Sequence, residues 1–334
     1  MVMAGCSGGA TPPDSSVSAT PSDTPTDTAS ATPAPDATPT PLASIDAINV
    51  TSSTYNSGEP SVSGPFPFNV GQTQCKTLDK GTGSTVADDS LLELNYYGIN
   101  ASTGVMFQSS WETGQTMIGQ NGGFVTGFNN CLTGQTQGSR VLMVISSADG
   151  YDAQGGSSSA GINVGDTLVF VVDIITVGFT APTGDTVATG NQWVSVSTDS
   201  SGTPTATVNP GQSAPSTLQT TVLIQGTGNP VQADDFTLLN FFTMDFSSGQ
   251  YIENSFTDGN GPQYGALANL IPGWRTAIQG QPSGSRLLII VPPSLAYPQG
   301  NATPSIAPNS TLVCVVDILF TSPTNAEAQS QSGQ

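Results

Sequence analysis

The chain has 334 residues and a formal net charge of −19, because 24 acidic residues stand against only five basic ones. Such a charge repels a phosphate backbone or an anionic lipid surface, so nucleic-acid binding is excluded as a function. Histidine is absent, which excludes histidine-based triads, histidine metal sites and imidazole general bases. The sequence contains no phosphate-binding loop or dinucleotide fingerprint, so we expect no cofactor and no metal.

The N-terminal residues Met3-Ala4-Gly5-Cys6 are typical of the end of a bacterial lipoprotein signal, in which a cysteine after small residues is lipidated on sulfur. The apolar stretch of such a signal is not found among the five residues before Cys6. Residues 7–44 consist mainly of Thr, Pro, Ser and Ala, a composition that cannot bury a core. We expect residues 1–44 to be a disordered linker and the protein to be extracytoplasmic, attached to the membrane only through a lipid on Cys6.

One pattern of turns and strands occurs twice in the rest of the chain, at an offset of 144 to 146 residues. The clearest matches are Gly81-Thr82-Gly83 with Gly226-Thr227-Gly228, Leu94-Asn95-Tyr96-Tyr97 with Leu239-Asn240-Phe241-Phe242, and Gly138-Ser139-Arg140 with Gly284-Ser285-Arg286. A repeat of this length predicts two related domains, residues 45–180 and 186–322, followed by a polar tail at 323–334.

Each domain is predicted to consist mainly of strands with one short helix. Apolar or β-branched runs at 91–97, 141–145 and 168–177 are bounded by Gly, Asn and Ser, as strands are. The helices are indicated by apolar residues at i, i+3 and i+4 with a glycine after them: Phe128, Cys131 and Leu132 before Gly134, and Trp274, Ala277 and Ile278 before Gly280. These signals predict an α+β fold, in which each domain is a mostly antiparallel curved sheet with one short helix packed on its concave face.

Both domains resemble the FKBP-type peptidyl-prolyl cis/trans isomerases, the immunophilins that bind the macrolide tacrolimus. In the first domain the resembling segments are Tyr96-Tyr97-Gly98, Phe107-Gln108-Ser109-Ser110, Gly127-Phe128, Gly150-Tyr151 and Thr167-Leu168-Val169-Phe170. In the second they are Pro272-Gly273-Trp274, Val291-Pro292-Pro293, Ala296-Tyr297 and Ile306-Ala307-Pro308. The resemblance implies proline-containing polypeptides as substrates and macrolides such as tacrolimus as ligands.

The resemblance also implies an aromatic pocket for the proline ring in each domain. In the first domain its residues would be Tyr96, Phe107, Phe128 as the floor, Tyr151, Ile162 and Phe170. In the second they would be Phe241, Ile252, Glu253, Trp274 as the floor, Tyr297, Ile306 and Cys314. The family usually has a tryptophan floor, and an aspartate where this chain has Gln108 and Glu253. The second domain has Phe241, Ile252 and Cys314 at three wall positions, which removes a hydroxyl and enlarges the pocket. We therefore expect the first domain to have the more complete pocket, although core packing remains the alternative for any one ring.

The expected chemistry needs no acid or base. Rotation about an X-Pro bond breaks no covalent bond and only has to overcome the loss of amide resonance, a barrier of about 18–20 kcal/mol. A dry apolar pocket favours the twisted amide over the planar, charge-separated one. The resemblance implies that the backbone N–H of Ile162 or Ile306 holds a substrate carbonyl and that the hydroxyl of Tyr151 or Tyr297 assists.

Two cysteines of the first domain are missing together from the second. Cys75 and Cys131 correspond to Thr220 and Ala277, and this joint absence predicts a disulfide, as an oxidising compartment would allow. Two independent buried thiols are the alternative. Cys314 lies in an apolar run and is predicted to be an inert core residue.

Three functions are compatible with these observations. The first is a lipid-anchored prolyl isomerase that acts on exported proteins, with one or both domains active. The second is a non-catalytic tandem module on the cell surface that binds proline-containing segments as a chaperone. The third is an all-β adhesin, which predicts two sheets packed face to face with no helix at Phe128 or Trp274.

Overall fold

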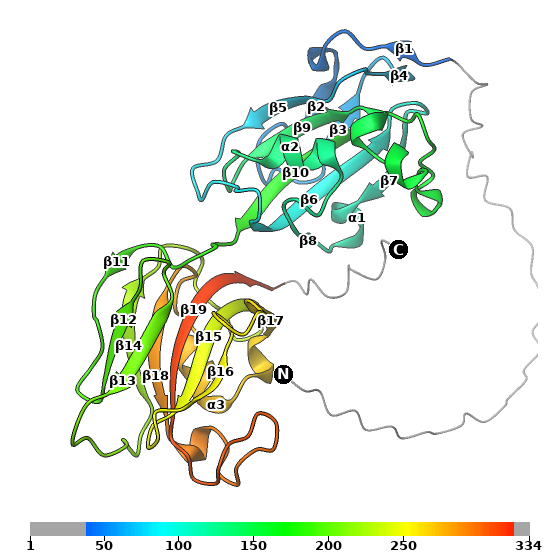
Figure 1. Cartoon of the computed structure of the whole chain (residues 1–334). Coiled ribbons are helices and arrows are strands. Elements are labelled where there is room, and N and C mark those ends of the chain that lie inside the picture. The colour runs from blue at the N-terminus through cyan, green and yellow to red at the C-terminus, as the bar shows by residue number, and fades with distance from the viewer. Residues whose placement is uncertain (1–37, 324–334) are drawn as a thin grey trace, which may run out of the picture. The chain divides into compact units, whose positions relative to one another are not determined.

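The structure, a computed structural model, describes residues 38–323 (Figure 1). Cys6, most of the predicted linker and nearly all of the predicted tail lie outside the described residues. Within them the chain forms two large sheets, three two-stranded sheets and few helices, so the predicted α+β class with mostly antiparallel sheets is confirmed.

The first domain is built on one antiparallel sheet with the strand order β5-β9-β10-β6-β7, and β8 also pairs with β6. The strands are β5 (Gln74–Asp79), β6 (Leu91–Asn100), β7 (Val105–Ser109), β8 (Met117–Gln120), β9 (Arg140–Ile145) and β10 (Leu168–Val177). The helix α2 (Thr126–Leu132) lies across one face of this sheet (Figure 1). A single-turn helix, α1 (Ser110–Thr113), follows β7 and was not predicted.

The second domain repeats this arrangement with the order β11-β14-β18-β19-β15-β16, and β17 pairs with β15. The strands are β11 (Asp185–Thr186), β14 (Gln219–Gln225), β15 (Phe236–Asp245), β16 (Tyr251–Asn254), β17 (Gln263–Ala266), β18 (Arg286–Val291) and β19 (Leu312–Ser322). The helix α3 (Pro272–Ile278) takes the place of α2.

The two helices form for the reasons that the sequence indicates. Phe128, Cys131 and Leu132 are buried on one side of α2, and Trp274, Ala277 and Ile278 are buried on the same side of α3. Gly134 and Gly280, each two residues beyond its helix, have a φ of +82°, which glycine adopts at little cost. Helices at Phe128 and Trp274 contradict the face-to-face sandwich that the adhesin reading requires.

Each sheet has a second apolar face, which a β-hairpin covers. In the first domain the hairpin is β2 (Asn49–Thr51) with β3 (Ser61–Ser63), and in the second it is β12 (Val194–Thr198) with β13 (Pro204–Val208). Residues of these segments pack in a separate cluster with the outward side chains of the sheet. This explains why every residue of β9 and β18 is buried, as expected for strands that are covered on both faces.

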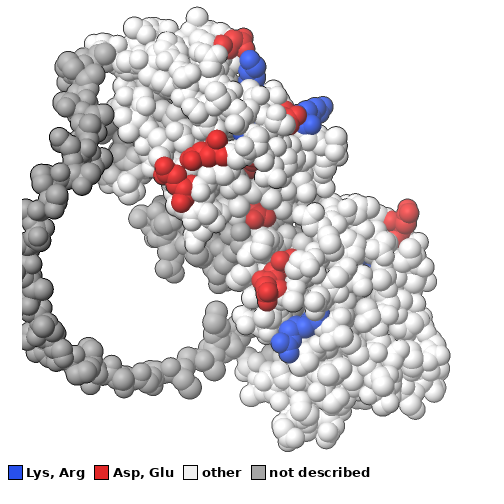
Figure 2. Space-filling model, turned by 180° about the vertical axis from the view of Figure 1, so that it is seen from behind, with Lys and Arg blue, Asp and Glu red and all other residues white. Residues whose placement is uncertain are grey.

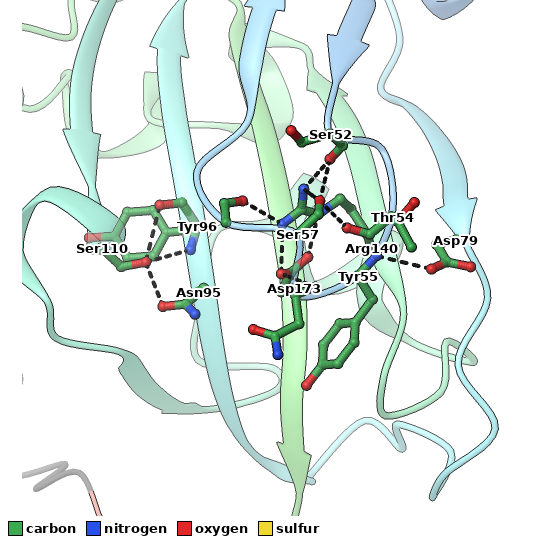
Figure 3. Close-up of polar contacts among 12 residues, drawn as sticks. Ser52, Thr54, Tyr55, Ser57, Asp79, Asn95, Tyr96, Ser110, Arg140 and Asp173 are labelled. Atoms are coloured by element: carbon green, nitrogen blue, oxygen red, sulfur yellow. Dashed lines mark hydrogen bonds and ion pairs between the residues drawn. The ribbon is translucent and has the colours of Figure 1, made fainter.

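An arginine in each sheet binds this hairpin. Arg140 of β9 donates hydrogen bonds to Ser52 O, Ser57 Oγ and Gly58 O (Figure 3). Arg286 of β18 likewise donates to Thr198 Oγ1 and Gly202 O. The repeated Gly-Ser-Arg segments of the sequence therefore place an anchor for the hairpin in both domains.

The first domain is extended by short elements on its N-terminal side. The 3-10 helix η1 (Ile45–Ala47) is capped by Ser44, whose side chain accepts a hydrogen bond from the N–H of Asp46. β1 (Thr40–Pro41) pairs in parallel with β4 (Phe68–Asn69). These elements complete the cluster on the second face through the buried side chains of Ile45, Ile48 and Phe68.

Candidate active site

The six residues predicted to form the pocket of the first domain lie together in one cluster, although they come from distant parts of the chain. They are Tyr96 on β6, Phe107 on β7, Phe128 on α2, Phe170 on β10, and Tyr151 and Ile162 in the loop that joins β9 to β10. The ring of Phe170 is central, since its centroid lies 5.6 Å from that of Phe107 and 5.2 Å from that of Phe128. Both contacts are edge to face, the arrangement that aromatic rings favour.

The cluster is buried on its inner side and open on its outer side. Phe128, Ile162 and Phe170 are only 3–6% exposed, whereas Tyr96, Phe107 and Tyr151 are half-buried. Burial and the neighbouring Tyr151 raise the pKa of Tyr96 to about 12, and burial also raises the pKa of Tyr151. Neither hydroxyl has a hydrogen-bond partner among residues 38–323, so both can donate to a bound molecule.

A serine that follows β7, Ser110, holds the backbone of β6 at the pocket residue Tyr96. Ser110 Oγ accepts a hydrogen bond of 2.9 Å from the N–H of Tyr96 and donates one of 2.9 Å to Asn95 Oδ1 (Figure 3). In the second domain Ser255 Oγ makes the same two bonds, to the N–H of Phe241 at 2.8 Å and to Asn240 Oδ1 at 2.5 Å. The role of these serines was not predicted, although each keeps the same spacing from its repeated asparagine.

The second domain brings its predicted residues together in the same way. Phe241, Ile252, Trp274, Tyr297, Ile306 and Cys314 belong to one cluster. The rings of Phe241 and Trp274 meet edge to face with centroids 4.9 Å apart. The indole Nε1–H of Trp274 donates a 3.3 Å hydrogen bond to Cys314 Sγ. Burial raises the pKa of the Cys314 thiol to about 11, so this thiol is protonated at neutral pH.

Glu253 lies at the outer side of this cluster. It is half-buried, and burial together with the charge of Asp258 raises the pKa of its carboxyl. The pKa of the Tyr297 hydroxyl is raised by burial and by the charge of Glu253. The corresponding residue of the first domain, Gln108, is exposed.

The prediction that the backbone N–H of Ile162 or Ile306 holds a substrate carbonyl is wrong. The N–H of Ile162 donates to Ser157 O at 2.9 Å, and the N–H of Ile306 donates to Asn301 O at 2.9 Å. Each isoleucine closes a small antiparallel bridge within its loop, so neither N–H is available to a substrate. A buried apolar residue beside the rings does not reveal where its own backbone N–H is bonded.

Two other backbone N–H groups are available beside the floor rings. Val125 and Ile271 are the residues immediately before α2 and α3, and they are partly exposed. Within residues 38–323 neither N–H has an acceptor, as is common at the start of a helix. Each lies three residues before its floor residue, Phe128 or Trp274, and its side chain packs against the same cluster.

Cys75 and Cys131 form a disulfide, with their Cα atoms 5.5 Å apart. The bond joins the edge strand β5 to α2, the helix that carries Phe128. The second domain has Thr220 and Ala277 at these positions, so no disulfide joins α3 to β14.

In the described part of the chain, no three His, Cys, Asp or Glu residues lie where they could hold a metal ion together. None of the helices between residues 38 and 323 combines the length and the apolar character that crossing a membrane requires.

Comparison with known proteins identifies the same domain twice. The family model described as FKBP-type peptidyl-prolyl cis-trans isomerase matches residues 82–175 and 230–319. FkpA, an isomerase of this type from Escherichia coli K12, is 32% identical over 102 residues, which are 30% of this chain and 37% of that protein. An FK506-binding protein from Streptomyces anulatus is 31% identical over 112 residues, 33% of this chain and 90% of that protein.

Solved structures of similar proteins are also found. The crystal structure of Escherichia coli FkpA matches with 30% sequence identity and a TM-score of 0.30, covering 39% of this chain and 53% of that one. This chain thus spans only part of FkpA in either comparison. The family model, by contrast, matches more than half of the chain. The chain therefore belongs to the FKBP-type peptidyl-prolyl cis-trans isomerase family and contains two domains of it.

Proposed function

We propose that this protein isomerises X-Pro bonds in polypeptides outside the cytoplasm through the aromatic clusters of its two domains. The observation that carries the proposal is an edge-to-face cluster of rings, buried inside and half-buried outside, beside a backbone N–H with no partner in the described chain. A proline ring is apolar and compact, and the peptide carbonyls next to it accept hydrogen bonds, so both features suit an X-Pro segment.

The proposed reaction uses these groups without proton transfer. The proline ring packs on Phe128 or Trp274, and the N–H of Val125 or Ile271 donates to a substrate carbonyl. The apolar walls exclude water, which removes hydrogen bonds that stabilise the planar amide, and the hydroxyl of Tyr151 or Tyr297 can donate to the twisted one. Lowering the barrier by about 7 kcal/mol accelerates rotation by roughly 10⁵-fold.

The first domain is proposed to be the more active one. In its site the ring of Phe170 contacts the rings of both Phe107 and Phe128, and two tyrosine hydroxyls have no partner in the described chain. In the second domain, Cys314 stands in the place of Phe170 and Ile252 in the place of Phe107. Smaller side chains at these places leave the proline ring with fewer contacts.

The test is an isomerisation assay of the full chain on a short X-Pro peptide, with and without tacrolimus. We expect acceleration that tacrolimus inhibits, a large loss in Tyr151→Ala, and a smaller loss in Tyr297→Ala. The alanine variants are compared at equal folded fraction, measured by circular dichroism. Peptide binding without any acceleration would support the non-catalytic binding module instead and would overturn the catalytic proposal.

We also propose that a lipid on Cys6 attaches the protein to the outer side of the cell membrane. The support is the Ala-Gly-Cys segment and the Thr- and Pro-rich residues that follow it, together with a disulfide of the kind found in oxidising compartments. Mass spectrometry of the protein purified from membranes should find the acyl groups on Cys6, and Cys6→Ser should release the protein from membranes. Membrane attachment that persists in Cys6→Ser would contradict the anchor.

A further inference from the structure

The two candidate sites differ in charge at one equivalent position. Gln108 on β7 lies opposite Gly98, and Glu253 on β16 lies opposite Thr243, so the two side chains occupy the same place in the two sheets. Gln108 is neutral and exposed, whereas Glu253 is an acid and half-buried. A substrate in the second domain therefore meets a carboxylate that a substrate in the first domain does not meet.

The carboxylate of Glu253 acts on the site itself. Its charge contributes to the raised pKa of Tyr297, after burial, and to that of Cys314. Tyr297 and Cys314 both belong to the cluster around Trp274, and Ile252, the residue before Glu253, packs against that cluster too. The charge thus lies close enough to influence a ligand bound on the Trp274 ring.

Glu253 has no partner of its own in the described chain. Within residues 38–323 its carboxylate takes part in no hydrogen bond and no ion pair. The position of Tyr96 in the first domain is occupied by Phe241 in the second, so the second site lacks this tyrosine hydroxyl as a donor. Burial removes part of the hydration of this carboxylate, and no hydrogen-bond donor in the described chain replaces it. An ion pair with an approaching cation is therefore favourable.

The chain itself supplies few cations that could compete for this carboxylate. Of the five basic residues, Arg140 and Arg286 are buried in ion pairs with aspartates, and Lys76 pairs with Asp46. The other two, Lys80 and Arg275, are exposed and form no ion pair within residues 38–323, and Arg275 donates a hydrogen bond to Ala268 O. On the face of the molecule in Figure 2 the charged side chains are sparse, and most of them are acidic. Within residues 38–323 no basic side chain forms an ion pair with Glu253, so its carboxylate is open to a cationic group of a bound molecule.

We infer that Glu253 makes the second site selective for proline segments that carry a lysine or arginine next to the proline. This inference rests on the proposed binding of X-Pro segments. The expected size is modest, because the carboxylate is only half-buried. An ion pair of this exposure changes affinity by up to about fivefold, and salt weakens it.

The test uses the full chain with ¹⁵N-labelled tryptophan and follows the indole N–H signal of Trp274, which reports on the second site alone. Three peptides that differ only in the residue before proline, Lys, Leu or Glu, are titrated, and a second set varies the residue after it. We expect the lysine peptide of at least one set to bind about three- to fivefold more tightly than its leucine peptide, and the glutamate peptide of that set to bind more weakly. The preference should shrink at high salt.

Variants separate the effect of this carboxylate from that of the overall negative charge. Glu253→Gln should abolish the lysine preference, and Glu253→Asp should retain part of it. Asp185→Asn removes one exposed charge from β11, at the opposite edge of the same sheet, and should leave the preference intact. A preference that survives in Glu253→Gln, or no preference in the unmodified chain, overturns the inference. If no proline peptide moves the Trp274 signal and none is isomerised, it is the proposed function that has failed.

Discussion

The guanidinium of Arg140 donates two hydrogen bonds to the carboxylate of Asp173, at 2.6 and 2.7 Å, and both side chains are almost fully buried. Arg286 and Asp317 repeat the pair at the same two distances in the second domain. Since both arginines also donate to the backbone of the hairpin on the second face, at Gly58 O and Gly202 O, each pair joins the sheet to its hairpin.

Removing one member of such a pair should be strongly destabilising. Asp173→Asn leaves the Arg140 guanidinium buried without its counter-charge, and a buried pair broken in this way costs about 3–5 kcal/mol of folding free energy. Urea unfolding of the variant should show this loss in the first domain only. Lys76→Gln breaks an exposed ion pair with Asp46 and is the matched control, for which we expect no measurable change. Equal effects of the two variants would contradict the anchoring role.

For each sheet, the face that carries the helix and the site could be predicted from the sequence, whereas the opposite face, covered by a hairpin, could not. Phe128 and Trp274 could be placed on helices because their spacing to Cys131 and Ala277 is helical, and the repeat fixed which rings correspond. The hairpins were missed because residues such as Val50 and Val196 lie in short, polar segments that show no strong period. Nothing in the sequence revealed that the N–H of Ile162 is bonded within its loop or that the N–H of Val125 is not, since backbone groups are the same at every residue.

Loss of the disulfide should affect the first domain alone. The bond closes a loop over a sequence separation of 56 residues, and such a cross-link stabilises a protein by about 2–4 kcal/mol. Replacing Cys75 and Cys131 by Thr and Ala, the residues of the second domain, should lower the melting temperature of the first domain. It should also reduce isomerase activity, because α2 carries Phe128. Unchanged melting of both domains in calorimetry would show that packing alone holds α2.

The raised pKa of Glu253 predicts how stability of the second domain depends on pH. Because burial raises the pKa in the folded state, the folded domain binds a proton at Glu253 more tightly than the unfolded chain does. This contribution favours folding when the carboxyl is protonated in both states, below the ordinary pKa of about 4.3, and it is lost as the pH rises through the raised value. Glu253→Gln should therefore raise the melting temperature at pH 7 and have little effect at pH 3.5.

The control for this pH effect is again Asp185→Asn, which removes an exposed charge from the same domain. It should change the melting temperature by a similar small amount or not at all at both pH values. A stabilising effect of Glu253→Gln that is the same at pH 3.5 and pH 7 would show that the gain does not come from the ionised carboxylate.

Gly98 leaves the space that the ring of Phe107 occupies, so a larger residue at position 98 requires a smaller one at position 107. A Cβ on Gly98 would lie 2.6 Å from Phe107 Cζ, closer than real contacts allow, and 3.1 Å from Phe170 Cε1, which is a tight contact. In the second domain the same places hold Thr243, Ile252 and Cys314, so a smaller wall there coexists with a β-branched residue beneath it.

Gly98→Thr should destabilise the first domain by about 1–3 kcal/mol, as overpacking does, and should lower activity by displacing the rings. Adding Phe107→Ile should restore most of the stability but not the activity, because the ring itself is gone. A triple variant with Phe170→Cys should fold as well as the unmodified domain, and urea unfolding with the X-Pro assay measures both effects. If Gly98→Thr alone is neutral in both measurements, the wall ring moves freely and the rigid aromatic site is contradicted.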